Sequence, residues 1–367
     1  MSQQVALEAL GVAVAARTPV LLWGAPGTGK TSAIKAMANN MGWPCETVIA
    51  AIREPSDFAG LPIISDGGVL LAPPKWARDL ATVEKGILFL DEISTAPPAV
   101  QAALLRVVLE RVVGDLALPE GVVVVAAANP PEQAADGWDL SAPLANRFCH
   151  LDWEVEASAF AAGLSGGWQA PKVPELGADW EAGLPMSRAL VSAFVAVRPA
   201  LACALPSDSA SSGRGWPSPR TWDMASRLLT AAVSADVSDD AIHSLVIGSV
   251  GDGAGIEFLA WRKEMDLPDP DEVLLDPDSF KLPKRGDRAY AALVAVASAV
   301  ASNPTIDRWL AGWKVLAKAG KAAPDVAAMA ARILASARPP GASAPPEIKI
   351  FIPLLKEAGL LKEEQDD

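Results

Sequence analysis

Short apolar runs bounded by turn residues mark the first half of this chain. They are TPVLLW at 18–23, CETVIA at 45–50, ILFL at 87–90 and VVVVAAA at 122–128. Continuous aliphatic runs of this length are typical of strands buried in a parallel sheet. We therefore predict a strand at each of the four positions.

Helix-compatible segments alternate with these strands. QVALEALGVAVAA at 4–16 precedes the first strand, TSAIKAMANNMG at 31–42 stops at a glycine, and AVQAALLRVVLERVV at 99–113 separates the last two strands. Strands separated by helices predict a parallel sheet covered on both faces, the α/β class. The stretch between Arg53 and Val83, rich in proline and glycine, interrupts this alternation and is interpreted as an insertion carrying a hairpin at about 53–72.

Beyond Trp153 the strand signals largely vanish, and predicted helices are separated by clusters of Gly, Pro, Ser and Asp. We expect three parts: an αβα core at 1–155, an all-helical lid at 156–262 and a helical C-terminal segment at 263–367. The length of 367 residues agrees with one large domain or two unequal ones.

A phosphate-binding motif lies between the first predicted strand and the helix that follows it. The motif G-x-x-x-x-G-K-[ST] is formed by Gly24, Ala25, Pro26, Gly27, Thr28, Gly29, Lys30 and Thr31. Its glycines let backbone N–H groups approach phosphates, the lysine reaches the β and γ phosphates, and the threonine hydroxyl can ligate Mg²⁺. The motif predicts a site for ATP and Mg²⁺, against the alternative of a plain glycine turn.

Polar residues follow two further predicted strands. Asp91 and Glu92 end ILFL, and Asn129 follows VVVVAAA. Ligands of open α/β sheets lie at the carboxyl ends of the strands, so Asp91 is expected to hold Mg²⁺, Glu92 to polarise the attacking water and Asn129 to contact the γ-phosphate. The alternatives are a solvated acidic turn for the two acids and an ordinary Asn-Pro turn for Asn129.

Composition narrows the choice of partners. Hydrophobic residues make up 51% of the chain, charged residues 20%, and the net charge is -13. The acidic balance disfavours a nucleic-acid partner, which needs positive charge to neutralise phosphates. Three cysteines without a CxxC pair favour a reducing compartment, and without an export leader or a run of 18 apolar residues we expect a cytoplasmic protein with no membrane span. The two histidines, His150 and His243, show no catalytic spacing and are interpreted as structural.

An ordered set of segments resembles the MoxR-like, dynein-related (AAA_5) branch of the AAA+ ATPases. The segments are GAPGTGKT, REPSDFAGLP, LLAPPKWARDL, GILFLDEISTAPPAVQAALLRVVLER, VVVVAAANP, LANRF and SPRTWDMASRLL. The resemblance is nearly continuous over 17–153 and weaker to about 262.

The resemblance implies roles for three residues that contact ATP, of which Arg147 and Arg220 are new. Asn129 resembles the first sensor, Arg147 the arginine finger that acts on a neighbour's ATP, and Arg220 the second sensor; surface salt bridges are the alternative for both arginines. Many relatives carry an acid before the finger arginine, whereas this chain has Asn146. Arg111 is a second candidate for a contact across subunits, against a helix-end ion pair.

The same resemblance implies an activity and partners. We expect a Mg²⁺-dependent ATPase that assembles with itself as a ring, a hexamer by analogy, and remodels or matures a protein client like a chaperone, with a von Willebrand factor A domain protein as partner. The insertion would face the ring pore or the client, or be a plain surface loop. The alternatives are a nucleotide-gated binding scaffold and a motor that remodels nucleic acid.

Overall fold

The computed structural model describes residues 2–65, 67–130, 138–168, 171–265, 267–320 and 324–357. The chain divides into two compact units. The first comprises Met1–Ala178 and Leu201–Glu257, and the second comprises Asp179–Ala200 and Phe258–Asp367. Within the described residues, no helix has the length and apolarity needed to cross a membrane.

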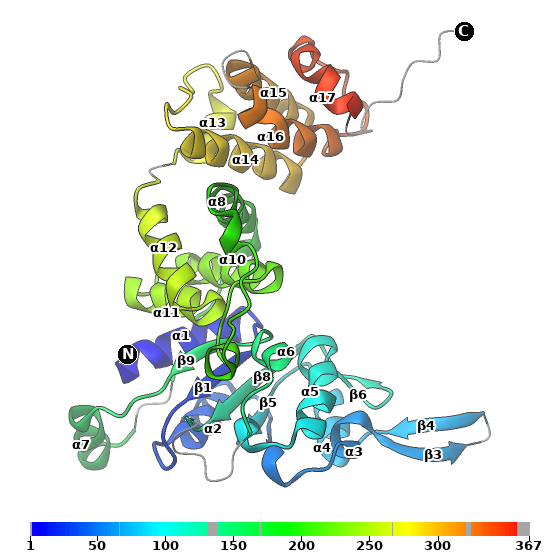
Figure 1. Ribbon diagram of the computed structural model, residues 1–367, viewed down its shortest axis with the longest axis vertical. Helices are drawn as coiled ribbons and strands as arrows, with labels where there is room; N and C mark the ends of the chain where they lie inside the picture. The colour runs from blue at the N-terminus through cyan, green and yellow to red at the C-terminus, as the bar shows by residue number, and fades with distance from the viewer. Residues whose placement is uncertain are drawn as a thin grey trace. The chain divides into compact units, whose positions relative to one another are not determined.

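A five-stranded parallel sheet forms the centre of the first unit (Figure 1). Its order is β2-β5-β8-β1-β9. The strands are β1 (Val20–Trp23), β2 (Cys45–Ile49), β5 (Lys85–Asp91), β8 (Gly121–Ala128) and β9 (Cys149–Asp152). The predicted α/β fold with a parallel sheet is confirmed.

Both faces of this sheet are covered. On one face Leu88 and Leu90 belong to a core shared with Trp76 and Leu104, which lie on α4 (Lys75–Ala81) and α5 (Pro98–Glu110). Successive residues of a strand point to opposite faces, and Phe89 between the two leucines is equally buried. Flanking helices α1 (Gln3–Ala15) and α2 (Lys30–Met41) also contact the sheet.

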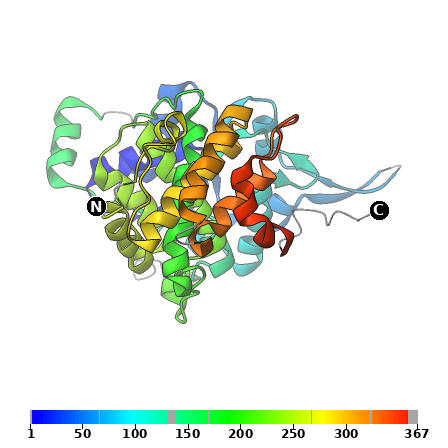
Figure 2. The same ribbon diagram turned by 90° about the horizontal axis from the view of Figure 1, so that it is seen from above.

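The expected insertion contains a hairpin of β3 (Leu61–Ser65) and β4 (Gly68–Ala72), which extends away from its unit in two perpendicular views (Figures 1 and 2). Its base contacts a second, short hairpin of β6 (Val112–Val113) and β7 (Leu116–Ala117). Gly60 and Gly114 meet there so closely that an added side chain on either would collide with backbone. Short elements η1 (Ala50–Ile52), α3 (Ser56–Ala59), η2 (Ile93–Thr95) and α6 (Ala142–Ala145) complete the core.

The long helix ends earlier than its pattern predicts. We expected a helix through residue 113, but α5 ends at Glu110 and Val112–Val113 forms strand β6. Arg111 takes a left-handed conformation with φ 54° as the C-cap, and Gly114 follows with φ 60° in the hairpin turn. Two adjacent valines fit a helix or a strand. The turn at Gly114 lets them pair with β7, so they form a strand.

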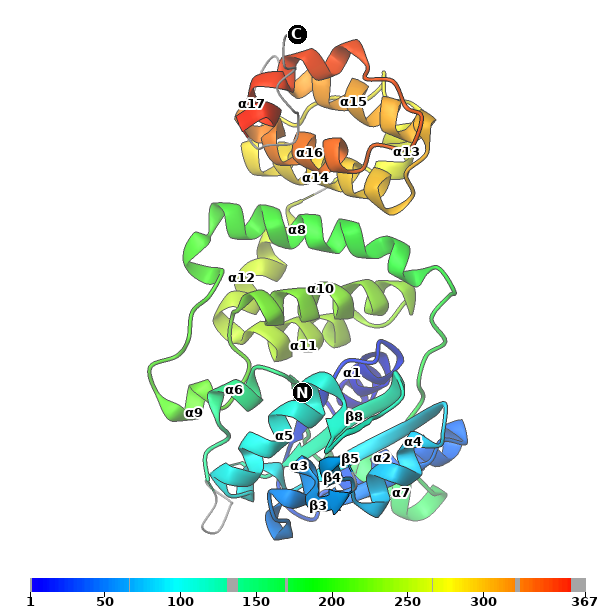
Figure 3. The same cartoon turned by 90° about the vertical axis from the view of Figure 1, so that its right-hand side faces the viewer.

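The helical part of the first unit packs on the outer edge of the sheet. Helices α10 (Pro219–Ser234) and α11 (Asp239–Val250) lie side by side and contact α1, and α11 also contacts β9 (Figure 3). Gly248 lets α11 approach β9, since an added Cβ would lie 2.1 Å from the carbonyl oxygen of His150. Helices α7 (Ala157–Gly166) and α9 (Ser209–Ser212) belong to the same unit.

The second unit is a helical bundle. Helix α14 (Gly286–Ser302) contacts α8 (Leu184–Val197), α15 (Ile306–Gly320) and α16 (Pro324–Ser336), and the last two also contact each other (Figure 3). Smaller elements are η4 (Trp180–Gly183), α13 (Pro270–Leu275), η6 (Pro346–Phe351) and α17 (Ile352–Glu357), and η5 (Pro199–Leu201) contains a boundary between the units. Helix α12 (Asp252–Lys263) contains the boundary between the units.

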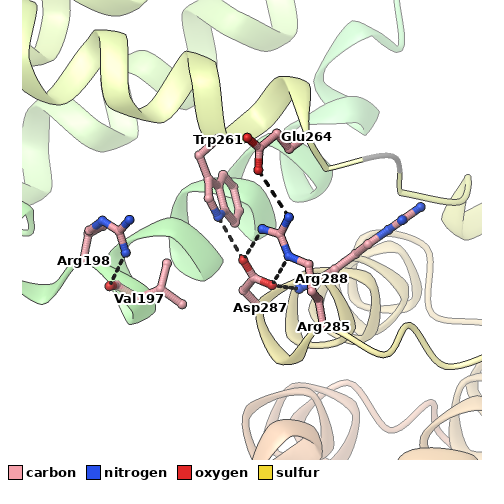
Figure 4. A network of polar contacts seen from close by, with 7 residues as sticks. All are labelled: Val197, Arg198, Trp261, Glu264, Arg285, Asp287 and Arg288. Atoms are coloured by element: carbon pink, nitrogen blue, oxygen red, sulfur yellow. Dashed lines mark hydrogen bonds and ion pairs between the residues drawn. The ribbon is translucent and has the colours of Figure 1, made fainter.

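A polar network ties α12 to the start of α14 within the second unit (Figure 4). The Asp287 carboxylate accepts hydrogen bonds from the Arg285 guanidinium at 2.7 Å and from the Trp261 indole at 3.1 Å. Arg285 also forms an ion pair with Glu264 at 3.2 Å. These donors, with Arg285 first, lower the pKa of Asp287 to about 2.

The two compact units do not follow the boundaries expected for the lid. Within the range 156–262, α8 packs with α14 in the second unit, whereas α10 and α11 belong to the first. Clusters of Gly, Pro and Ser mark where helices end, but packing partners decide to which unit a helix belongs.

Candidate nucleotide-binding site

The glycine-rich loop follows β1 and leads into α2. Gly27 and Gly29 have φ values of 78° and 89°, which residues with a side chain rarely adopt. An added Cβ on either would meet nothing within 4 Å, so the space beside the loop is open. This loop can therefore wrap backbone groups around phosphates, with the N-terminus of α2 behind them.

Lys30 is buried, with its ammonium surrounded by oxygen atoms. Its Nζ donates to the carbonyl oxygens of Gly24 at 2.6 Å and Ala25 at 3.0 Å, and to Asn129 Oδ1 at 3.2 Å. Burial lowers the pKa of Lys30, while the charge of Asp91 opposes that shift. A buried ammonium that recruits three uncharged acceptors is well suited to phosphate oxygens, which would add the negative charge.

Thr31 and Asp91 lie together beside this lysine. The Thr31 hydroxyl donates to Asp91 Oδ2 at 2.9 Å, and Asp91 Oδ1 accepts from the backbone N–H of Glu92 at 3.0 Å. A hydroxyl and a carboxylate are the oxygen ligands that Mg²⁺ takes when phosphates supply others. Over the described residues, no group of three or more His, Cys, Asp and Glu side chains is arranged for a metal.

Glu92 has an unusual backbone conformation. Its φ of 55° and ψ of 41° are left-handed, a conformation that non-glycine residues adopt at a cost and often at functional sites. Its side chain is exposed and makes no hydrogen bond or ion pair within the described part of the chain. The carboxylate is therefore available to accept a proton from water.

Asn129 reaches the site from the end of β8. Because Trp23 pairs with Ala128, the residues after β1 and β8 lie next to each other at one edge of the sheet. The side-chain Oδ1 of Asn129 accepts from Lys30, and its backbone carbonyl oxygen accepts from the Ser94 hydroxyl at 3.3 Å. The structure thus brings Lys30, Thr31, Asp91 and Asn129 together.

Trp153 was not identified from the sequence, yet it supports the glycine-rich loop. Its indole N–H donates to the Thr28 carbonyl at 3.0 Å. It also packs so closely under Gly24 that an added Cβ there would lie 2.5 Å from the Trp153 carbonyl oxygen. In the sequence, Trp153 is visible only as an aromatic residue after the apolar segment that forms β9. The pairing of β9 with β1 in the sheet is what brings it beside the loop.

His150 is a buried structural residue of β9, where it lies opposite Leu21 of β1. Its Nδ1 accepts from the Trp23 indole at 2.8 Å, so its Nε2 carries the proton that is donated to the Ala145 carbonyl at 2.9 Å. Desolvation lowers the pKa of His150 from 6.5 to about 4. The Arg214 guanidinium lies 4.3 Å from the ring centroid of Trp23 and pairs with Asp152 at 2.8 Å.

This pKa shift predicts a loss of stability in acid. Between pH 6.5 and 4 the unfolded chain binds a proton at His150 that the native chain does not, so the free energy of unfolding falls as the pH falls. Wild type should lose about 2–3 kcal/mol more than His150→Gln between pH 7.5 and 4.5. Urea unfolding at both pH values measures this difference. The exposed His243→Gln should follow wild type; an equal pH dependence in wild type and His150→Gln would contradict the prediction.

Arg147 and Arg220 lie close together in the first unit. Burial, and then the charge of Arg220, lower the pKa of Arg147. The Arg147 guanidinium donates to the Pro143 carbonyl, and its buried Nε has no hydrogen-bond partner. Arg220 donates to Asn146 Oδ1 at 3.4 Å. Among the described residues neither arginine forms a salt bridge, so the surface ion pairs considered as an alternative are not what holds them.

Asn146, the residue before Arg147, is buried against the start of α10. Its Oδ1 accepts from the Ser218 hydroxyl at 2.9 Å as well as from Arg220, and its Nδ2 donates to the Trp216 carbonyl at 3.4 Å. The amide thus satisfies donors and an acceptor together, which a carboxylate cannot do.

The sheet separates Arg147 from the glycine-rich loop of its own chain. Strands β1 and β9 are parallel, with Val20 opposite Cys149 and Trp23 opposite Asp152. Arg147 lies just before Cys149, whereas the loop begins just after Trp23. The two therefore lie at opposite ends of neighbouring strands.

Arg111 forms a contact within its own chain. Its guanidinium donates to the Glu120 carbonyl at 2.7 Å, and no carboxylate of the described residues pairs with it. The alternative of an ion pair at the helix end is therefore wrong, because Arg111 bonds to the backbone carbonyl of Glu120 instead.

Comparisons with known proteins find matches to the part of the chain that contains this site. Residues 19–148 match the AAA domain of the dynein-related subfamily. Protein MoxR of Methylorubrum extorquens is 34% identical over 120 residues, which cover 30% of this chain and 32% of that protein. Chaperone MoxR1 of Mycobacterium tuberculosis is 31% identical over 137 residues, which cover 36% of this chain and 35% of that protein. The chain thus matches about a third of the length of these relatives.

Among solved structures, a candidate ATPase from Cytophaga hutchinsonii is similar with a TM-score of 0.44 and 19% identity. The similarity covers 66% of this chain and 79% of that one.

Proposed function

We propose that this chain, a MoxR-like AAA+ protein with a dynein-related AAA domain at residues 19–148, is a Mg²⁺-dependent ATPase that works as a ring. The observation that carries the proposal is that the residues suited to bind phosphate and Mg²⁺ lie far from Arg147 within one chain. Lys30, Thr31 and Asp91 meet at the carboxyl ends of the parallel strands, whereas Arg147 lies just before the amino end of β9. A second copy could supply its arginine to the first.

Each residue at the loop edge has a task in hydrolysis. Lys30 and the backbone N–H groups of the loop bind the β and γ phosphates. Thr31 and Asp91 would hold Mg²⁺, which when bound neutralises charge on the phosphates. Glu92 accepts a proton from the attacking water, and Asn129 orients that water or the γ-phosphate. The oxygen-rich surroundings of Lys30 and the hydroxyl–carboxylate pair support this assignment.

Arg147 and Arg220 would complete a neighbour's site. Two arginines that repel each other and have no carboxylate partner among the described residues are suited to an anion with several charges. The γ-phosphate of an adjacent subunit is such an anion. On this proposal Arg147 acts as the arginine finger. Arg220 acts as the second sensor at the same junction between subunits.

The proposed output is remodelling of a protein client. The β3–β4 hairpin exposes apolar side chains, with 94% of Ile64, 67% of Val69 and 59% of Leu61 accessible. Exposed apolar patches mark surfaces that bind proteins. The name of Chaperone MoxR1 supports a chaperone-like role, and a hexameric ring with a von Willebrand factor A domain partner is part of the proposal.

Turnover as a function of protein concentration tests the ring. With ATP and Mg²⁺ present, activity per subunit should rise as light scattering reports assembly, because each site needs two subunits. Arg147→Ala should assemble and bind nucleotide but stay inactive. Activity per subunit that is flat across a range in which the protein stays monomeric would overturn the shared site.

A further inference from the structure

A buried glutamine links two parts of the first unit that are far apart in sequence. Gln101 lies on the first turn of α5 and is 1% exposed. Its Nε2 donates to the Ala96 carbonyl at 3.0 Å and to the Asp139 carbonyl at 3.3 Å, and its Oε1 accepts from the Ser141 backbone N–H at 2.8 Å. The side-chain amide therefore uses both of its hydrogens and its oxygen in a buried setting, where each lost bond is costly.

One end of this link is the segment from Asp91 to Ala96 in the nucleotide site, which we call the acidic turn. Glu92 opens η2, and Ala96 is the residue that caps it. Ser94 within η2 donates to the carbonyl oxygen of Asn129. Gln101 thus binds the end of a short segment that begins at Glu92 and contacts the residue beside Lys30.

The other end leads directly to Arg147. Ser141 is the N-cap of α6, which spans only Ala142–Ala145, and its side chain makes no capping bond. Leu144 and Ala145 are buried in the core shared with α5, and the Arg147 backbone N–H donates to the Leu144 carbonyl at 3.1 Å. A four-residue helix has little stability of its own, so external contacts fix its position. Gln101 supplies the bond at its start.

We propose that Gln101 is a positioning residue for the arginine finger: it holds the loop and helix that carry Arg147 against the acidic turn of the same subunit. The inference rests on the proposed shared ATP site. It follows that loss of Gln101 acts in trans. The altered subunit keeps its own glycine-rich loop, Thr31 and Asp91, but presents a misplaced arginine to its neighbour.

The first test is Gln101→Met, which keeps the length of the side chain and removes its polar atoms. We expect kcat for ATP to fall by about 10²-fold, the effect of a displacement near 1 Å in a catalytic group, with nucleotide affinity unchanged. Gln4→Met, at an exposed position on α1, should behave like wild type. Wild-type kcat in Gln101→Met would overturn the proposal.

Mixed rings then locate the defect. Gln101→Met subunits co-expressed with Glu92→Gln subunits should regain turnover, because the first supply an intact acidic turn and the second an intact finger. Gln101→Met with Arg147→Ala should stay inactive, since both lack a working finger. The reverse pattern would place the defect in the subunit's own site and overturn the proposal, as would inactivity of both mixtures.

A control pair separates this inference from the function on which it rests. Arg147→Ala with Glu92→Gln should regain turnover if sites are shared at all. If that mixture is inactive, the shared site itself fails, and the role of Gln101 in trans fails with it. If it is active, the Gln101 mixtures test Gln101 alone.

Ser141→Pro replaces the first variant if Gln101→Met does not fold. Ser141 has φ −62°, which suits proline, and its N–H has Gln101 Oε1 as its acceptor. The substitution removes that bond without altering α5. The same pattern of complementation is expected, and wild-type kcat would count against the proposal.

Discussion

Replacing Arg147 by alanine is expected to lower kcat for ATP hydrolysis by on the order of 10³-fold or more, because an arginine finger contributes 10³- to 10⁵-fold. The affinity of each subunit for ATP should change little, since Arg147 lies at the far end of β9 from its own glycine-rich loop. Steady-state turnover and binding of a fluorescent ATP analogue measure the two quantities separately.

Arg111→Asn is the matched control for this prediction. It also removes one arginine, and asparagine tolerates the left-handed backbone that Arg111 adopts. Because the Arg111 guanidinium is bound to the Glu120 carbonyl of its own chain, turnover should stay close to wild type. Loss of activity in Arg111→Asn together with normal activity in Arg147→Ala would transfer the role in trans to Arg111.

Glu92→Gln is expected to lower kcat by about 10²- to 10⁴-fold, the range for loss of a general base. The amide keeps the shape of the side chain and cannot take the proton from water. Nucleotide binding should persist, because Lys30, Thr31 and Asp91 make the contacts around the loop without Glu92. Phosphate release and nucleotide binding, measured on the same preparation, test both parts.

Glu84→Gln provides the control at the opposite end of the same strand. Glu84 is exposed and precedes β5, whereas Glu92 follows it. Normal turnover is expected for Glu84→Gln, and normal turnover in Glu92→Gln would remove Glu92 from the chemistry. If Glu92→Gln lost hydrolysis but still supported the biological output, the nucleotide-gated scaffold would replace the remodelling ATPase.

The sequence by itself determined the nucleotide-binding core. Buried parallel strands need continuous apolar runs, so β1, β5 and β8 are visible as such. The glycine-rich loop is also local, because its positive φ values require glycine at 27 and 29. Strand ends then locate Asp91 and Asn129, since parallel strands bring their carboxyl ends to one edge.

Only the tertiary structure decided features that depend on contacts between distant segments. Val112 and Val113 suit a helix or a strand, and the turn at Gly114 makes them a strand. The sequence of α8 does not show to which unit the helix belongs, because it packs against α14, which lies far along the chain.

The roles of single polar residues follow the same rule. In the sequence, Gln101 is only one polar position in an apolar helix. The fold brings its amide to the Ala96 carbonyl and the Ser141 N–H. Arg147 and Arg220 are 73 residues apart, and no local pattern predicts that they meet. Local patterns determine which elements form because their hydrogen bonds and burial are local. The pairing of side chains across elements is set by packing of the whole unit, which one stretch of sequence does not encode.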